Sequence, residues 1–426
     1  MKEINKMFKN LLLIKNNKNL IGNFSYLFII NIANYIIPFV TFPYIVRVIG
    51  VEKFGLLSFA LSIITYFTII VDYGFNLYAT REVSINRNSR TKLNQIFSNV
   101  VFIKIMLSIL CFIVLCIVIS LFPILRNNPE VYLYTFGIVI GQALLPIWYF
   151  QGIEKMKIVS ILFFISKFLS SVPVFFWVKS KEDYLIIPFL NSLLSIIMGI
   201  VGIIIVYRKG IRFIPISKNS VYDYLKNGWH LFLSNLSVSL YTVSITTILG
   251  LFSNNTIVGY YSISDRLISA IKSVISPFSQ VFYPHLSNMF LTSKEKVIAI
   301  NKKLLIFGGA FFLVMCSILF LFAGEIIWVV FHNNSQEVIN VFRIMSFIPF
   351  IIYVHTIYAL FTILVFGFNK EYSRIIISGG IINLLIAFIL IPMYFHIGAA
   401  LCVVIIEIYI GIRYILFLNS KNIKLI

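Results

Sequence analysis

The sequence has 426 residues, of which 60% are hydrophobic and 12% are charged, and its mean hydropathy is +0.96. Soluble globular domains are usually less than half apolar, so this composition excludes a soluble protein. The net charge of +20 would suit a nucleic-acid partner, but the basic residues gather in particular loops, and we expect no nucleic-acid binding.

Long apolar runs follow one another along the whole chain. A membrane-spanning helix needs about 20 apolar residues, and lipid leaves backbone polar groups unsatisfied in any other open structure, so these runs are expected to be helices. Twelve spans are predicted, at residues 22–47, 53–76, 97–121, 131–150, 158–178, 184–207, 228–250, 256–284, 304–330, 338–366, 374–393 and 398–418.

The distribution of basic residues predicts the orientation of these spans. If the N-terminus lies inside, 24 of the 35 Lys and Arg residues fall in cytoplasmic segments and 5 in outer loops. This bias follows the positive-inside rule and predicts cytoplasmic N- and C-termini in a multi-pass membrane protein. The lysine-rich segment 1–21 is expected to lie against anionic membrane lipids.

The second and eighth predicted spans share a pattern at an offset of 204 positions, which places Gly55 over Gly259 and Ser58 over Ser262. Polar residues in both spans recur at steps of three and four, as on one face of a helix. Two such helices suggest two lobes that face a shared, wet cavity, as in a transporter. The polar positions are Ser58, Ser62, Thr65, Thr68, Asp72 and Asn76 in the first copy, and Ser262, Arg266, Ser269, Lys272, Ser276 and Gln280 in the second.

The predicted fold is therefore an all-α integral membrane protein, with 12 transmembrane helices in two pseudo-symmetric six-helix lobes around a central cavity. Both halves start inside, so the repeat is parallel. The predicted divisions are a cytoplasmic N-terminal segment 1–21, an N-lobe 22–207, a cytoplasmic linker 208–226, a C-lobe 227–418 and a cytoplasmic tail 419–426.

Basic residues inside the predicted spans outnumber acidic ones. A charge at mid-membrane costs about 3 kcal/mol and usually faces a protein interior or a pathway, although residues near a span end can reach the interface instead. The excess of cations favours an anionic cargo. The predicted cationic cavity consists of Lys272, Arg266, Lys167, Arg343 and Lys104.

Polar and acidic residues of the spans give two further sets of candidates. The predicted polar stripe of the cavity consists of Ser62, Thr65, Asp72, Asn34, Ser269 and Asp265. The candidates for ion coupling are Asp72, Asp265 and Glu407, and the histidines His285 and His355 are either structural or proton-coupled.

Several chemistries lack their sequence signals. The four cysteines and five histidines have no metal-ligand spacing, and the chain has no phosphate-binding Gly-rich loop or nucleophile elbow. We therefore expect no metal, no cofactor, no catalytic residues and no enzyme activity. An ion gradient or downstream consumption of the product is expected to drive transport.

Two stretches resemble the N-terminal signature of polysaccharide repeat-unit flippases. They are the segment from Asn31-Ile-Ala-Asn34-Tyr35 to Thr80-Arg81-Glu82, with Asp72-Tyr-Gly-Phe-Asn76, and the segment Pro146-Ile-Trp-Tyr-Phe-Gln-Gly-Ile-Glu-Lys-Met156. Those flippases belong to the multidrug/oligosaccharidyl-lipid/polysaccharide exporter superfamily. The resemblance implies a protein of the bacterial cytoplasmic (inner) membrane that flips undecaprenyl-pyrophosphate-linked glycan units for O-antigen or capsule synthesis. It also implies a cationic lumen, coupling to cation movement, and a polysaccharide polymerase as partner.

Two alternatives stay open. A drug or small-cation exporter of the same fold would be expected to carry more intramembrane acids than bases, whereas this chain has six bases and four acids in its predicted spans. A membrane polysaccharide polymerase or ligase would be expected to have a long outer loop, and no predicted outer loop exceeds about a dozen residues.

Overall fold

The computed structural model describes residues 18–332 and 335–425, which form helices joined by short turns and contain no strand. The first half contains α2 (Lys18–Asp72), α3 (Phe75–Ile85), α4 (Arg90–Leu121), α5 (Pro123–Arg126), α6 (Pro129–Leu144), α7 (Ile147–Gly152), α8 (Met156–Trp177), the 3-10 helix η1 (Lys181–Leu185) and α9 (Ile186–Arg208). The second half contains α10 (Lys218–Thr242), α11 (Ser244–Phe252), α12 (Asn255–Lys272), α13 (Ile275–Phe290), α14 (Lys294–Leu321), α15 (Ala323–Phe331), α16 (Gln336–Met345), α17 (Ile348–His355), the π-helix η2 (Thr356–Leu364) and α18 (Asn369–Ser420).

The two longest helices, α2 and α18, each contain a sharp bend. In α2 the bend is at Gly50, whose φ of 78° is accessible to glycine without the clash that a side chain would cause. In α18 it is at Phe395, with φ 48°. Each bend falls between two predicted spans, 22–47 and 53–76 in α2, and 374–393 and 398–418 in α18.

Eight helical segments of the described residues are long and apolar enough to cross a membrane, which indicates a multi-pass membrane protein. They are Val40–Ile85, Arg90–Leu121, Pro129–Gly152, Met156–Trp177, Lys181–Arg208, Lys294–Leu321, Gln336–Leu364 and Asn369–Ser420. The predicted spans 228–250 and 256–284 correspond to the broken pairs α10–α11 and α12–α13, which are not among the eight. The number twelve stays a prediction.

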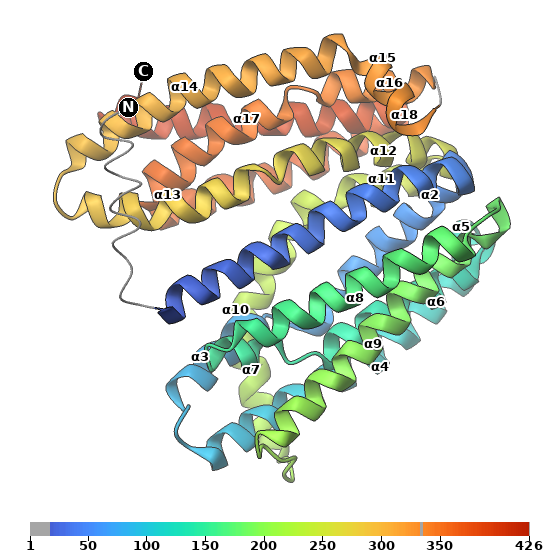
Figure 1. The fold of residues 1–426 in the computed structure, drawn as a ribbon, viewed down its shortest axis with the longest axis vertical. Helices are drawn as coiled ribbons and strands as arrows, with labels where there is room; N and C mark the ends of the chain where they lie inside the picture. The colour runs from blue at the N-terminus through green and yellow to red at the C-terminus, as the bar shows by residue number, and fades with distance from the viewer. Residues whose placement is uncertain (1–17, 333–334, 426) are drawn as a thin grey trace.

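The helices lie in an arrangement that brings α2 and α12 together. Figure 1 shows α14 and α17 along one side of the molecule and α4, α6, α8 and α9 along the other, with α2 and α12 between them. The most extensive helix contacts are those of α6 with α9, α2 with α12 and α2 with α8. The centre of the molecule is therefore built around α2.

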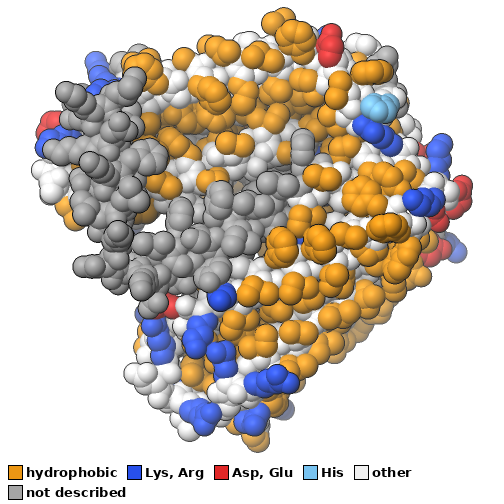
Figure 2. All heavy atoms as spheres, in the orientation of Figure 1, with side chains coloured by type: hydrophobic (Ala, Val, Ile, Leu, Met, Phe, Trp, Pro, Cys, Tyr) orange, Lys and Arg blue, Asp and Glu red, His pale blue; other side chains and the backbone are white. Residues whose placement is uncertain are grey.

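The outer surface of the helices is apolar along its length. Large side chains such as Ile109, Phe307 and Leu385 are more than half exposed, and Figure 2 shows hydrophobic side chains covering the visible helices from end to end. Lys and Arg gather on this face near the end where α3 and α7 lie. A surface of this kind suits lipid around the helices and polar head groups at their ends.

Candidate functional site

A cavity of about 260 Å³ lies among α2, α6, α8 and α9, and one residue of α12 also reaches it. Its wall mixes apolar side chains with many polar ones. The polar residues are Thr41, Ser58, Thr135, Gln142, Ser166, Lys167, Ser170, Ser171, Asn191, Ser195 and Arg266. The described part of this cavity therefore combines two cations with hydroxyl and amide groups.

Lys167 and Arg266 bring their charges to the cavity from opposite halves of the sequence. Lys167 is half-buried on α8. Arg266 comes from α12, and although it lies deep in the protein its side chain is exposed to the cavity. The two side chains are close enough to interact electrostatically. Because like charges repel, an anion placed between them would be favoured.

Aromatic rings hold the guanidinium of Arg266 in place. Its centre lies 5.4 Å from the ring centroid of Phe42 and 5.9 Å from that of Phe54, both on α2. Rings at this distance attract a cation through their negative faces. The planar guanidinium can bind two phosphate oxygens at once, whereas the Lys167 ammonium acts as a point charge.

The α8 helix supplies a polar face to the cavity. Ser166 and Ser170 are four residues apart, as are Lys167 and Ser171, so these side chains repeat once per helical turn and all line the cavity. Opposite them, α6 and α9 pack closely because a Cβ at Gly141 would overlap the backbone of Ser195. This packing places Gln142 and Asn191 in the same wall.

Lys104 and Asp72 form an ion pair away from this cavity. The Nζ of Lys104 on α4 donates to the Oδ1 of Asp72, the last residue of α2, at 2.9 Å. The Lys104 side chain is 3% exposed and that of Asp72 is 19% exposed. Each charge therefore has a partner within the protein, which fits a structural role of the pair better than a direct role in cargo binding.

The predicted polar stripe on α2 does not face one cavity. Ser58 lines the cavity, but the hydroxyl of Ser62 accepts a hydrogen bond from Thr247 of α11 at 2.9 Å. Thr65 is half-buried and donates to the Leu61 carbonyl of its own helix. Asn34 is part of α2, and its side chain is not among those that the structure describes.

Four other predicted site residues do not line this cavity. Lys272 and Asp265 are half-buried on α12 and interact with one another electrostatically. Arg343 is half-buried in the last turn of α16. Ser269 is half-buried on α12, between Asp265 and Lys272 in sequence. Of the five predicted cavity cations, the structure therefore brings together two, Lys167 and Arg266.

Contacts on the predicted outer side join α2 to the second half of the chain. The Arg47 guanidinium donates to the carbonyls of Val329 and Val330, each at 3.0 Å, near the end of α15. The ring of Phe42 meets that of Phe331 edge-on, with centroids 5.2 Å apart. The C-terminal end of a helix carries a partial negative charge, so it attracts the arginine.

Contacts also join the halves at the C-terminal end of α2. Tyr73, which follows α2, stacks on Phe232 of α10 with centroids 4.9 Å apart and an angle of 7° between the rings. Tyr78 and Tyr224 meet edge-on at 5.7 Å. In the described structure α2 therefore contacts α15 next to its bend, and the segment that follows its C-terminal end contacts α10.

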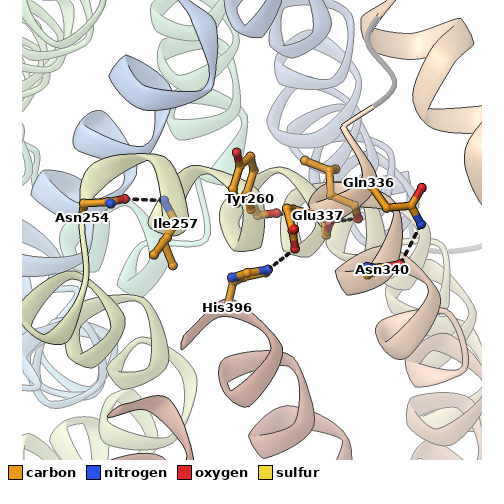
Figure 3. Close-up of polar contacts among 9 residues, drawn as sticks. Asn254, Ile257, Tyr260, Gln336, Glu337, Asn340 and His396 are labelled. Carbon is orange, nitrogen blue, oxygen red and sulfur yellow. Dashed lines mark hydrogen bonds and ion pairs between the residues drawn. The ribbon is translucent and has the colours of Figure 1, made fainter. Parts of the chain in front are cut away.

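A polar cluster fixes α12 at the predicted outer end (Figure 3). The Asn254 side chain caps α12 by accepting from the Ile257 backbone N–H at 3.0 Å, which satisfies a free donor of the first turn. His396, beside the bend of α18, contacts Glu337 of α16 at 2.8 Å, and its ring lies 5.5 Å from that of Tyr260 on α12. The cluster joins three helices of the second half.

Glu407 is also paired. Its Oε2 lies 3.1 Å from Nδ1 of His355, and the side chains of Glu407 and His355 are only 9% and 11% exposed. The other histidine candidate, His285, lies on α13 and its Nε2 is buried. Among the described residues no group of three or more His, Cys, Asp or Glu side chains could hold a metal ion.

The sequence prediction missed most of the cavity wall. Gln142 and Asn191 are single polar residues in apolar runs, and the serines of α8 surround Lys167 at helical spacing. That spacing was a usable signal.

The sequence of this chain is similar to those of known proteins. Residues 20–290 match the model of a family described as "Polysaccharide biosynthesis protein". A protein of Escherichia coli (strain K12) named "Putative O-antigen transporter" is 32% identical over 414 residues, which cover 96% of this chain and 98% of the relative. The chain belongs to the polysaccharide biosynthesis protein family.

Solved structures show which fold this family member has. A multidrug resistance MATE family transporter of the MOP superfamily, in an inward-facing conformation, matches 90% of this chain and 94% of its own length with a TM-score of 0.70 and 13% identity. The lipid II flippase MurJ, in an inward closed conformation, matches 97% of this chain and 87% of its own length with a TM-score of 0.53 and 14% identity. The chain therefore shares the fold of those two proteins.

Proposed function

We propose that the chain flips undecaprenyl-pyrophosphate-linked oligosaccharide repeat units across the bacterial cytoplasmic membrane for O-antigen or capsule synthesis. The observation that carries the proposal is the pair of cations, Lys167 and Arg266, in a cavity otherwise lined by hydroxyl, amide and apolar groups. Two cations suit a diphosphate, and the neutral polar groups suit sugar hydroxyls. The prenyl chain would stay in the lipid.

The proposal includes alternating access between two lobes. In it, twelve transmembrane helices divide into the lobes 22–207 and 227–418, with the termini and the linker 208–226 in the cytoplasm. The bends of α2 and α18 at Gly50 and Phe395 support the count of twelve, because each bend separates two predicted spans within one long helix. The lobes rock about the cavity, driven by a cation gradient, and a polysaccharide polymerase uses the product.

The position of Arg266 supports a role for the cargo in the conformational cycle. Arg266 comes from the second half and Lys167 from the first, so a bound diphosphate would contact both. Movement of α12 away from α2 would separate the two cations and weaken the diphosphate contacts. In this proposal, Lys272, Arg343 and Asp265 lie outside this cavity and act at other points of the transport path. The ion pair of Lys104 with Asp72 fixes the end of α2.

The test is a flipping assay in proteoliposomes. A fluorescent undecaprenyl-diphosphate oligosaccharide is followed between leaflets with a membrane-impermeant quencher, for the wild type, Lys167→Ala and Arg266→Ala. Each variant is expected to lower the rate at least tenfold, which corresponds to about 1.4 kcal/mol. Lys302→Ala, which removes an exposed lysine of α14, is the matched control and should leave the rate unchanged.

Two outcomes would contradict the proposal in different ways. Equal rates for all four proteins would remove Lys167 and Arg266 from the cargo site. Export of cationic dyes by the wild type, without movement of any of several lipid-linked glycans, would favour the drug exporter of the same fold.

A further inference from the structure

His355 and Glu407 lie together within two candidate membrane spans, well away from the ends of the predicted spans 338–366 and 398–418. His355 is the last residue of α17, within the span Gln336–Leu364, and Glu407 lies in the second part of α18. The 3.1 Å between Nδ1 and Oε2 is a hydrogen-bond distance. Ionisable side chains at such a depth are costly and commonly mark ion or proton pathways.

The surroundings are shaped around the imidazole. A Cβ at Gly411 would lie 2.8 Å from Nε2 of His355, so glycine provides the space for the ring. The ring meets Tyr414 edge-on at 5.7 Å. In the part of the chain that the structure describes, Nε2 is buried without a hydrogen-bond partner. A buried nitrogen of this kind calls for a water molecule or a functional explanation.

The helix that carries His355 changes its winding at that point. Residues Thr356–Leu364 form a π-helix, a rare conformation that is often found at functional sites. The fully buried Asn301 of α14 stabilises it by donating to the Phe361 carbonyl at 2.9 Å and to the Thr362 hydroxyl at 3.1 Å. A change from π- to α-helical winding would shift His355 relative to Glu407.

We infer that His355 and Glu407 form a buried proton-binding site, and that its protonation is coupled to the winding of residues 356–364. The inference deepens the proposed function, since it names the ion that would drive transport. With one shared proton the pair is neutral, either as imidazolium and carboxylate or as imidazole and carboxylic acid. A second proton binds to the Glu407 carboxylate and leaves a net charge of +1.

That extra charge explains why protonation would depend on conformation. A net charge is costly in a dry interior and less costly where water enters. Uptake of the second proton is therefore favoured when the site opens to water, and its release is favoured when the site closes. A sodium ion would bind less well than a proton at this pair. Hard cations prefer several oxygen donors, and of these two side chains only Glu407 supplies oxygen atoms.

Other ionisable groups lie on the elements that pack against α17. The neighbouring helix α18 contributes Tyr414, which stacks with Tyr372 at 6.3 Å, and the exposed Arg413. The π-helix contributes the buried Tyr358. The charged residues of α12 and α14, which also contact α17, are Asp265, Arg266, Lys272, Lys294, Glu295, Lys296, Lys302 and Lys303.

Infrared titration of the full-length protein in lipid tests the site without any cargo. The wild type is expected to show a pH-dependent carbonyl band of a protonated carboxylic acid, and Glu407→Gln should abolish it. His355→Gln should move the pH at which the band appears. Gly411→Ala should do the same, although it removes no ionisable group. Glu337→Gln, in the other His–Glu pair of the second half, is the matched control and should leave the band in place.

Transport in proteoliposomes with an entrapped pH indicator gives the second measurement. The wild type should move protons as the lipid-linked glycan flips, and His355→Gln and Glu407→Gln should lose the acceleration by a proton gradient. A wild-type protein whose carbonyl bands do not differ from those of Glu407→Gln at any pH, or a rate that follows sodium and moves no protons, would overturn the inference. If no glycan is flipped, the proposed function fails, and the infrared titration still decides whether the proton site exists.

Discussion

Gly55 and Gly259, which occupy equivalent positions of the internal repeat, lie against each other where α2 meets α12. A Cβ at Gly55 would lie 2.6 Å from the backbone nitrogen of Gly259 and would overlap the Asn255 carbonyl. A Cβ at Gly259 would lie 2.6 Å from Cγ1 of Val51. Glycine at both positions therefore allows the two backbones to touch, as small residues do in membrane helix pairs.

Replacing Gly55 should open this contact. Gly55→Ala is expected to push α12 away from α2 and expose the cavity on the predicted outer side, because backbone atoms cannot yield as a flexible side chain can. The measurement is labelling of Ser58→Cys by a membrane-impermeant maleimide added from outside, with the exposed Cys116 replaced by Ser. Labelling should be at least several-fold faster in the Gly55→Ala background.

Gly309→Ala is the matched control for that experiment. It lies within α14, where the nearest atom to a new Cβ would be 3.9 Å away, in ordinary contact. Faster labelling in this control, or none in Gly55→Ala, would contradict a gate formed by the two glycines.

Arg47→Ala should loosen the same side by a different route. It removes the hydrogen bonds to the Val329 and Val330 carbonyls. Because Arg47 is exposed, we expect a loss of about 1 kcal/mol of closure, or a roughly fivefold shift toward the open state. Distances between spin labels on α2 and α15 would report the shift. Arg126→Ala, an exposed arginine in α5, should leave those distances unchanged.

Lys104→Met should destabilise the protein because it leaves the Asp72 carboxylate without its partner. Breaking a buried ion pair in this way costs about 3 kcal/mol or more, whereas replacing both partners is far less costly. The melting temperature in detergent should therefore fall for Lys104→Met and largely recover in the double variant with Asp72→Asn. If the double variant melts at as low a temperature as Lys104→Met, the unpaired Asp72 carboxylate is not the cause of the destabilisation.

The fold was largely predictable from the sequence because apolar runs of membrane length determine where helices form. The bends at Gly50 and Phe395 fall where the gaps between predicted spans placed them, and the family match confirmed the resemblance read from residues 31–156. The breaks within the seventh and eighth predicted spans, at Val243 and between Lys272 and Ile275, were not predicted. Single residues that interrupt a helix leave little trace in hydropathy.

The site was less predictable because partners across helices depend on rotation and depth, which hydropathy does not give. Lys104 and Asp72 were both assigned to the cavity, yet the structure pairs them. His355 and Glu407 were considered separately, although they lie 3.1 Å apart. Lys167 and Arg266 belong to the predicted group of cavity cations, and the structure places both in the wall of one cavity. Their role in binding cargo stays a prediction.

Nearly all of the cavity wall comes from the first half of the chain, and this matters for chimaeras made between family members. Every lining residue except Arg266 comes from the segment between Thr41 and Met198. A chimaera that takes this segment from another family member would inherit nearly the whole polar lining of that donor. Cargo preference should then follow the donated segment, while the recipient keeps its own His355 and Glu407 and hence the proton site inferred for them.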